Sequence, residues 1–529
     1  MEGKGAKTFM RASGAQCSKK NSTRRTQHPA GQHSAHAAQQ KQFVRSFQKT
    51  ALYLEIPRSV DSVSKYISEQ AGNNAEKISN SSVNPPSPAS NSKKREKTFT
   101  GRVWAWGFWD WASAAFNAIV TTFVFSVYLT NPKLFGESAN AQLGIALGVA
   151  GILVAIVAPA LGQAVDRSGK SATVLNTTTL LTVFITAALF FVSPNEGRLW
   201  LGLFLLAAGN IAFETGSVIY NAMLSDISNS KNVGKISGFG WGLGYVGGIV
   251  LLLILFVGFI NPEVGWFGVT SENGLNVRVS MLIAALWTLV FSAPIMLIAK
   301  DKPRKKGTVS LGIIGAYKQL FRSIKEIWKV DRSVVWFLIS SAIYRDGLAG
   351  VFTFGAVLAG TAFGFAGGEV IIFGVVANLV AGIATIAFGY LDDILGARKV
   401  IIISVTSMVL MGMMVFIGHA GIMGLSAKQI YWIFGLGLCV FVGPTQSASR
   451  TYLARIAPKG TEGEIFGLYA TTGRAVSFLS PFMYSTAITI GAAITGNSLA
   501  DTAYFGILGI ALVLLVGLVS FLPVKNQEV

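Results

Sequence analysis

Long apolar stretches alternate with short polar turns from residue 104 to residue 523 of the chain. A helix of about 20 apolar residues is long enough to cross the hydrocarbon core of a bilayer, which is roughly 30 Å thick. We therefore predict an all-α membrane protein with two six-helix halves. Its twelve transmembrane helices are expected at 104–130, 142–165, 172–193, 199–224, 235–260, 278–299, 333–360, 369–391, 399–419, 428–448, 465–490 and 501–523.

A charged pattern occurs twice in the turns between these helices, as GQAVDRSGK at 162–170 and as GYLDDILGARK at 389–399. The copies share glycines, an aspartate and basic residues, namely Gly162, Asp166, Arg167, Gly169 and Lys170 in the first and Gly389, Asp393, Gly396, Arg398 and Lys399 in the second. Glycines allow close approach, and a carboxylate at a helix end can accept backbone hydrogen bonds. The basic residues are expected to hold lipid headgroups or to pair with acids on the facing half. The recurrence predicts a transporter built from repeats, with these turns as gating loops.

Lysine and arginine are unevenly distributed between the predicted loops. The loops on the N-terminal side hold Arg167, Lys170, Lys231, Lys235, Arg398, Lys399, Arg455, Lys459 and the cluster from Lys300 to Lys306, whereas the other side holds Lys133, Arg198, Arg278 and Lys428. Because positively charged loops stay in the cytoplasm, both termini are expected to be cytoplasmic. This bias and a basic tail account for the net charge of +19, so no nucleic-acid partner is inferred.

The regions outside the two halves differ in composition. Residues 1–102 are polar and basic, and we predict that they form a disordered cytoplasmic tail. Two explanations for this tail stay open: it acts on anionic lipid, or the start of translation has been placed too far upstream. Residues 103–300 form the predicted N-terminal half, 333–524 the C-terminal half and 525–529 a short tail. The linker, residues 301–332, has an amphipathic pattern with Lys318, Arg322, Lys325 and Lys329 opposite apolar positions. We expect its helix to lie in the membrane interface, with partner binding as the less favoured alternative.

Two predicted helices carry polar residues at steps of three or four, which places them on one face. The first helix has Asp110, Ser113, Asn117 and Thr121, and the fourth has Asn210, Glu214, Ser217, Asn221 and Ser225. A carboxylate at membrane depth costs about 3 kcal/mol, so it must face protein, water or substrate. Hydrogen bonds between helices explain scattered serines and threonines but explain Glu214 poorly. We predict a lined cavity. For Asp110, near the start of its helix, helix capping or anchoring at the membrane interface is an equal alternative.

The second half also carries candidates for a substrate or coupling site, namely Tyr344, Arg345, Asp346, Gln446 and Arg474. Gly347 and Gly350 are expected to allow a local break in the seventh helix, which would expose backbone groups to a ligand. Arginine suits a substrate carboxylate, but these arginines could equally neutralise Glu214 or Asp346. The sequence leaves both roles open.

The repeated turn resembles the loop signature of the major facilitator superfamily, G-x-x-x-D-(R/K)-x-G-(R/K)-(R/K), which lies between helices 2 and 3 and recurs in weaker form between helices 8 and 9. The first copy departs from this signature at Ser171. The second copy has Ile394 in place of the basic residue after Asp393 and shifts its basic pair. Two copies in a twelve-helix chain make the resemblance specific.

Further segments are similar to the vacuole effluxer-like branch of this superfamily. They are WGFWDWASAAFNAIVTTFVFSVYL, IYNAMLSDIS, GFGWGLGYVGG, YRDG at 344–347 and the segment from Gln446 to Pro481. The resemblance covers about residues 103–524 and implies a secondary transporter of a small solute, with amino acids as the leading class. The branch includes a fungal vacuolar amino-acid exporter and bacterial transporters. We expect a bacterial plasma membrane, with the vacuolar membrane as the alternative.

The deep titratable groups indicate how transport would be driven. We expect Glu214, before Asp110 or Asp346, to couple transport to protons. No antiporter Gly-Pro signature occurs in the fifth helix, so the direction of transport stays open.

Cys17 and Cys439 suit neither a disulfide nor a metal site, and no cofactor or nucleotide-binding sequence is recognised. We expect a monomeric transporter that is not an enzyme. The alternatives are a non-transporting sensor or scaffold and, less favoured, a membrane-embedded enzyme.

Overall fold

The computed structural model describes residues 98–303, 313–330, 332–422 and 424–525, which belong to one compact unit. Twelve helices in these residues are long and apolar enough to cross a membrane, so the predicted twelve-helix membrane fold is confirmed. The predicted N-terminal tail lies outside the described residues up to position 97. The C-terminal tail lies outside them after Lys525.

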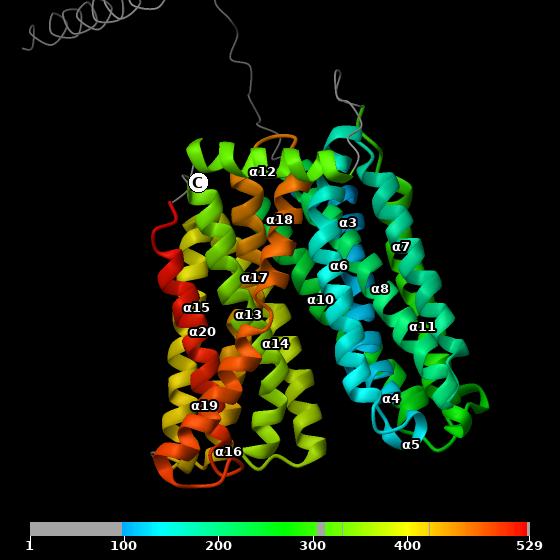
Figure 1. The fold of residues 1–529 in the computed structure, drawn as a ribbon, viewed down its shortest axis with the longest axis vertical. Helices are drawn as coiled ribbons and strands as arrows, with labels where there is room; N and C mark the ends of the chain where they lie inside the picture. Colours follow the sequence, from blue (N-terminus) through cyan, green and yellow to red (C-terminus); the bar gives the residue numbers. More distant parts are fainter. Residues whose placement is uncertain (1–97, 304–312, 331, 423, 526–529) are drawn as a thin grey trace, which may run out of the picture. The chain divides into compact units, whose positions relative to one another are not determined.

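Six of the spans form the N-terminal half, drawn in blue to green in Figure 1. They are α3 (Gly101–Ala115) continued by η2 (Phe116–Phe123) and α4 (Phe125–Leu129), α6 (Ala139–Ser168), α7 (Ser171–Ala188), α8 (Glu196–Ala222), α10 (Val233–Leu255) continued by η4 (Phe256–Ile260), and α11 (Leu275–Ile298). The side chain of Thr100 accepts a hydrogen bond from the N–H of Val103 and so caps the first helix. A π-helical segment, η2, interrupts this span in its middle.

The C-terminal half repeats this arrangement. Its spans are α13 (Arg332–Thr361), α14 (Gly367–Leu395), α15 (Ala397–Ile417), α17 (Leu436–Ile456), α18 (Glu462–Ala475) followed by α19 (Leu479–Thr495), and α20 (Gly506–Phe521). Contrary to the expectation from Gly347 and Gly350, α13 is continuous, and the broken span is the eleventh, at residues 476–478. Pro481, in the first turn of α19, has no N–H to bond to the carbonyl of Ser477 and so weakens a continuous helix at this place. Proline alone does not decide the break, because Pro159, Pro294 and Pro444 lie inside continuous helices.

The linker helix α12 (Ile313–Val330) lies across one end of the two halves (Figure 1). It packs against α6 of the N-terminal half and α13 of the C-terminal half, and the hydroxyl of Tyr317 donates to the carbonyl of Ile156. Its basic side chains, including Lys318 and Arg322, are exposed. The end of the molecule that carries α12 is called the α12 face below, and the opposite end the far face.

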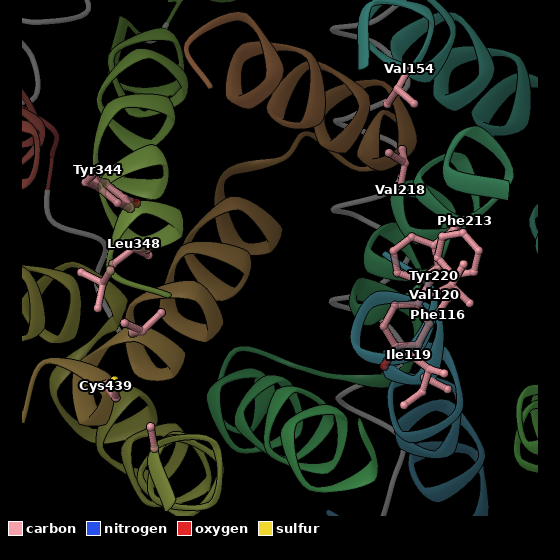
Figure 2. Packing of buried hydrophobic residues seen from close by; sticks show 14 of the residues in the cluster. Phe116, Ile119, Val120, Val154, Phe213, Val218, Tyr220, Tyr344, Leu348 and Cys439 are labelled. Carbon is pink, nitrogen blue, oxygen red and sulfur yellow. The ribbon is translucent and has the colours of Figure 1, made fainter. Parts of the chain in front are cut away.

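Buried aromatic and aliphatic side chains pack within each half. Figure 2 shows Phe116, Phe213 and Tyr220 grouped in the N-terminal half, and Tyr344 and Cys439 in the C-terminal half. Many large apolar side chains on the outer helix surfaces are exposed instead, as expected for helices that face lipid. Because lipid is as apolar as these side chains, close packing and polar contacts must hold the helices together.

Glycines allow the closest contacts between the halves. Gly238 of α10 lies so near α14 that a Cβ atom there would be 2.6 Å from the carbonyl oxygen of Thr385. Gly242, one turn further along α10, contacts Ile386 and the backbone of Gly382. This row of glycines brings two helix backbones together and positions the charged groups at their ends.

Candidate transport site

The first copy of the charged turn connects the end of α6 to the beginning of α18 in the other half. Asp166, in the last turn of α6, accepts hydrogen bonds from the backbone N–H groups of Gly463 (3.0 Å) and Glu464 (2.8 Å). First-turn N–H groups have no partner within their helix, and the helix dipole favours a negative charge there. Gly162, one turn before Asp166, touches the backbone of Gly463, where any larger residue would collide. These residues form a contact between the halves that we call the first latch.

The second copy makes the same contact in the opposite direction. Asp393, in the last turn of α14, accepts hydrogen bonds from the N–H groups of Gly234 (2.7 Å) and Lys235 (3.0 Å) at the beginning of α10. Gly389 takes the place of Gly162, since a Cβ atom on it would lie 2.7 Å from the carbonyl oxygen of Gly234. We call this contact the second latch. The sequence repeat thus corresponds to a repeated capping of one half's helix by the other half's carboxylate.

The second latch contains a further buried acid and two cations. Arg455, near the end of α17, places Nη1 2.6 Å from Asp392 Oδ1 and Nη2 3.4 Å from Asp393 Oδ1. Lys235 Nζ lies 3.7 Å from the other oxygen of Asp393. Asp392 is fully buried, and Val165 stands at the corresponding position of the first copy. The two acids and two cations balance in charge.

The second glycine of each turn adopts a backbone conformation that favours glycine, with φ of 74° at Gly169 and 87° at Gly396. Gly169 also holds the beginning of the linker, because its carbonyl accepts a hydrogen bond of 2.8 Å from the N–H of Lys302. Asp301 beside it accepts hydrogen bonds from the backbone and hydroxyl of Thr173, and these bonds lower the pKa of its carboxyl against the opposing effect of burial. The first turn and the linker are therefore joined at the α12 face.

Arg398 has neither of the two roles expected for the basic residues of the turns, which were to hold lipid headgroups or to pair with acids on the facing half. Its guanidinium donates to the carbonyls of Val524 (2.7 Å) and Leu522 (2.8 Å), so Arg398 holds the chain after α20 within its own half. The other basic residues of the two turns are the half-buried Arg167 and the exposed Lys170 and Lys399. Arg398 thus stabilises the C-terminal half and lies outside the second latch.

Behind the latches, Arg450 of α17 reaches into the N-terminal half. Its guanidinium lies 3.3 Å from Asp110 Oδ2 and 3.0 Å from Asn221 Oδ1, and it donates to the hydroxyl (3.0 Å) and the carbonyl (2.6 Å) of Ser237. The ring of Trp106 lies 4.8 Å from the guanidinium carbon. Because Asp110 lies well inside α3 and pairs with Arg450, the capping alternative for this residue is wrong.

Further from the α12 face, Glu214 of α8 forms an ion pair with Arg474 of α18. Glu214 stands two helical turns before Asn221, about 10 Å along the axis. Its side chain is 25% exposed and that of Arg474 is 33% exposed, against 4% for Arg450. Near this pair a further hydrogen bond joins the halves, because the hydroxyl of Thr471 on α18 donates to the carbonyl of Ala155 on α6 at 2.8 Å. The pair of Glu214 and Arg474 is therefore more exposed than the pair of Arg450 and Asp110, in which the side chain of Asp110 is 17% exposed.

The adjacent charges of α13 point to different parts of the broken helix. Asp346 is buried and accepts a hydrogen bond of 2.5 Å from the N–H of Ser480, in the first turn of α19. Arg345 donates to the carbonyl of Tyr469 on α18 at 2.9 Å, and its guanidinium carbon lies 3.7 Å from the centre of that ring. Both charges thus border the break between α18 and α19.

Four other predicted site residues lie apart from the contacts between the halves. Tyr344 is buried within the C-terminal half, where its hydroxyl is 2.7 Å from that of Ser449. Asn210 is buried within the N-terminal half, Asn117 is exposed on η2, and Gln446 is half-buried on α17. In the described part of the chain, the side chains of Asn210, Asn117 and Gln446 make none of the hydrogen bonds that join the halves.

Some residues of this network did not stand out in the sequence. The predicted tenth helix, 428–448, ended before Arg455, so this arginine was counted as a loop charge, whereas α17 continues to Ile456. Asp392 and Ser237 belonged to none of the sequence patterns from which the site residues were predicted. Gln446, Ser449 and Arg450 form a polar patch in the sequence, but nothing in it indicated that Arg450 contacts Asp110.

Comparison with known proteins identifies the family. The profile of the family described as "Vacuole effluxer Atg22 like" matches residues 138–528. The chain belongs to this family. The resemblance to the vacuole effluxer-like branch of the major facilitator superfamily is thereby confirmed.

Two relatives of this Atg22-like chain differ in how much they share with it. The uncharacterized MFS-type transporter YxiO of Bacillus subtilis is 25% identical over 435 residues, which cover 82% of this chain and 97% of that protein. Autophagy-related protein 22-1 of Neosartorya fischeri is 23% identical over 265 residues, which cover 47% of this chain and 42% of that protein. The chain therefore aligns with nearly all of the bacterial relative and with less than half of the fungal one.

Solved structures show the same fold. The proton:xylose symporter XylE superposes with a TM-score of 0.61 at 13% identity, over 81% of this chain and 96% of that chain. A bacterial homologue of the iron transporter ferroportin in the outward-facing state gives 0.58 at 13% identity, over 80% and 99%. At this identity the likeness establishes the major facilitator fold of the Atg22-like chain and nothing about its substrate.

Proposed function

We propose that this protein is a secondary active transporter that moves a small solute by alternating access, with efflux of amino acids coupled to protons as its specific activity. Its membership of a family of transporters supports the general activity. The substrate class and the direction are proposals that rest on the likeness to the vacuole effluxer family, and the coupling ion is a proposal that rests on the charged groups between the halves. We further propose that it works as a monomer.

The observation that carries this proposal is the one-sided distribution of contacts between the halves. We call Arg450 with its partners Asp110, Asn221 and Ser237 the Arg450 cluster. This cluster, both latches and the ion pair of Glu214 with Arg474 all lie in the parts of their helices that are nearer the α12 face. Figure 1 shows the two halves diverging towards the far face. Polar contacts and ion pairs that join two rigid halves at one end can be broken while the halves remain folded. Rocking about a site between them would then expose that site to each side in turn.

The orientation in the membrane is part of the proposal. The basic residues gathered at the α12 face support a cytoplasmic location for that face and for both termini. In that orientation the molecule is closed to the cytoplasm and faces outward. The near-complete match to the bacterial relative supports a bacterial plasma membrane over a vacuolar one.

Cysteine labelling in intact cells tests the orientation. Cysteine is introduced either at Glu263, exposed in the loop before α11, or at Lys329, exposed on α12, with Cys17 and Cys439 replaced by serine. An impermeant maleimide is expected to label Glu263→Cys directly and Lys329→Cys only after permeabilisation. The reverse pattern would place the α12 face outside and contradict the proposed orientation.

Proton coupling is assigned to Glu214. Its ion pair with Arg474 connects the halves, so protonation of the carboxylate would remove an attraction that favours the present state. The pair lies further from the α12 face than the Arg450 cluster and is partly exposed, so protons can reach it. Asp110 and Asp346 are second choices, because both are less exposed than Glu214.

Transport in liposomes tests the proposed activity. The purified protein is reconstituted, and uptake of a labelled mixture of L-amino acids is measured with and without an imposed pH gradient. We expect accumulation that depends on the gradient and is abolished in Glu214→Gln. Glu137→Gln, in an exposed loop of the far face, is the matched control and should transport like the unaltered protein.

The outcomes separate the parts of the proposal. Accumulation that is equal with and without the gradient, and unchanged in Glu214→Gln, would remove proton coupling through this residue. No accumulation of any amino acid in vesicles of either orientation would remove the proposed substrate class.

A further inference from the structure

The charges that lie in the inner part of the membrane spans can be accounted for pair by pair. Among the described residues, three arginines and three acids lie deeper in the spans than the two latches, namely Arg345, Arg450, Arg474, Asp110, Glu214 and Asp346. Arg450 pairs with Asp110, and Arg474 pairs with Glu214. One arginine and one acid remain, Arg345 and its sequence neighbour Asp346.

Arg345 and Asp346 do not neutralise each other. Successive residues of a helix point about 100° apart, and the Asp346 carboxylate is directed to the N–H of Ser480 at the beginning of α19. There the helix dipole and the N–H group already compensate its charge in part. Arg345 therefore has no carboxylate partner among the described residues.

The contacts of Arg345 orient its guanidinium without neutralising it. The carbonyl of Tyr469 accepts one hydrogen bond, and the Tyr469 ring lies against the guanidinium. A Cβ atom on Gly473 would lie 3.2 Å from Nη1, so the absence of a side chain at this position leaves room for the arginine. A guanidinium has five N–H donors, and a carbonyl and a ring leave several of them unused. An unpaired cation at this depth is costly and requires a compensating charge or water.

The surroundings of Arg345 are suited to a ligand. Tyr469 and Gly473 lie in the last two turns of α18, directly before the break at residues 476–478. Arg474, next to Gly473, reaches across to Glu214 in the other half. Arg345 thus lies beside the proposed coupling pair and a discontinuous helix, an arrangement that places backbone groups and charges around a substrate in transporters.

We propose that Arg345 is the anion-binding group of the transport site and that the transported solute carries a carboxylate. The planar guanidinium would hold both carboxylate oxygens through two parallel hydrogen bonds. This inference rests on the proposed function, since it assigns a substrate class to the same site. It also answers the question that the sequence left open, because Arg474 neutralises Glu214 and Arg345 is free to bind the solute.

Binding to the purified full-length protein in nanodiscs tests the inference without any transport step. The probes are the L-amino acids, measured singly by tryptophan fluorescence, each beside its own methyl ester, which lacks the negative charge. We expect at least one amino acid to bind and its ester to bind about tenfold more weakly or worse. Failure of every amino acid to bind, or equal binding of acid and ester, would overturn the proposal.

Variants of Arg345 separate a binding role from a structural one. Arg345→Gln is expected to weaken binding of the acid about tenfold or more and to remove the preference for the acid over the ester. Arg345→Lys keeps the charge and should recover part of the preference. The matched control, Arg322→Gln on the exposed side of α12, should bind like the unaltered protein. A preference for the acid that survives in Arg345→Gln would contradict the inference.

The thermal unfolding midpoint without ligand completes the test. Because Arg345 has no carboxylate partner, its loss should leave the midpoint near that of the unaltered protein. Amino-acid transport in liposomes that continues in Arg345→Gln would refute the inference and leave the proposed function intact. Binding that depends on Arg345 in a protein that does not transport would support the inference and refute the proposed function.

Discussion

The two latches use the same sequence pattern for the same purpose but differ in their charged surroundings. In each, a carboxylate in the last turn of one helix caps the beginning of a helix in the other half, and a glycine one turn earlier makes the approach possible. The second latch adds Asp392 and Arg455, where the first copy has Val165 at the position of Asp392. The capping geometry is therefore the common element, and the second latch adds the buried pair of Asp392 and Arg455 to it.

This comparison explains which parts of the signature are required for the contact. Gly162 and Gly389 have no space for a side chain, and Asp166 and Asp393 each receive two N–H groups. In the second copy, two positions that are basic in the signature or its shifted pair lie outside this geometry: Ile394 is 72% exposed, and Arg398 bonds to the end of its own half. Four predictions test this division, from the largest expected effect to the smallest.

The largest effect is expected from Arg455→Gln, because it leaves the buried Asp392 without its ion-pair partner. Breaking a buried pair from one side typically costs about 3–5 kcal/mol. The thermal unfolding midpoint of the purified protein should therefore fall clearly, more than in any variant of the first latch.

The double variant Arg455→Gln with Asp392→Asn is the control, since it removes both buried charges together. It should recover most of the lost stability, and Lys235→Gln, at 3.7 Å and partly exposed, should change the midpoint little. A double variant as unstable as Arg455→Gln would show that Arg455 stabilises the second latch by packing, and not by charge.

The glycines of the latches are expected to have the next largest effect. Gly162→Ala and Gly389→Ala each place a methyl group against the backbone of the other half, and overpacking of this kind costs about 1–3 kcal/mol. The methyl groups should open the latches, and a cysteine at Ser447, which packs against Ser237 between the halves, would report the opening by maleimide labelling.

Glycines of the same two helices serve as matched controls for this prediction. A Cβ atom on Gly148 of α6 or Gly374 of α14 meets nothing within 4 Å. Gly148→Ala and Gly374→Ala should therefore leave labelling at position 447 unchanged. Equal labelling in the latch variants and in these controls would mean that close approach of the glycines is not needed to close the α12 face.

The capping carboxylates are expected to have a smaller and similar effect in both latches. Asp166→Asn and Asp393→Asn keep an oxygen acceptor but lose the charge, and hydrogen bonds to charged groups contribute about 1.5–3 kcal/mol against about 1 kcal/mol for neutral ones. Labelling at position 447 should rise several-fold in either variant. A large effect confined to Asp393→Asn would show that Lys235 and Arg455, not helix capping, hold the second latch.

The smallest effect is expected from Ile394→Arg, which restores the basic residue of the signature in the second copy. Ile394 is exposed, and surface substitutions usually change stability by less than about 0.5 kcal/mol. Neither the unfolding midpoint nor labelling at position 447 should change. A marked change in labelling would show that the basic position takes part in closing the second latch.

Much of the fold could be predicted because it depends on local composition. The apolar stretches predicted all twelve spans, and the repeat predicted the positions of both latches on the chain. Predicted helix ends were less accurate where polar residues continue a helix, as at Arg450 and Arg455 in α17. The break was predicted in the seventh span from Gly347 and Gly350, but the structure has it in the eleventh, before Pro481. Glycine permits a break without requiring one, and proline does not decide its place either, since Pro159, Pro294 and Pro444 lie inside continuous helices.

The sequence by itself determined the number of spans, the two-fold repeat and the residue types that bear charge within the membrane, because these follow from hydropathy and spacing along the chain. Only the tertiary structure decided which charges meet. Arg450 and Asp110 come from different halves, as do Arg474 and Glu214, and their pairing depends on how the two bundles pack. That packing also left Arg345 without an acid partner among the residues that the structure describes, a property that no local pattern in the chain could indicate.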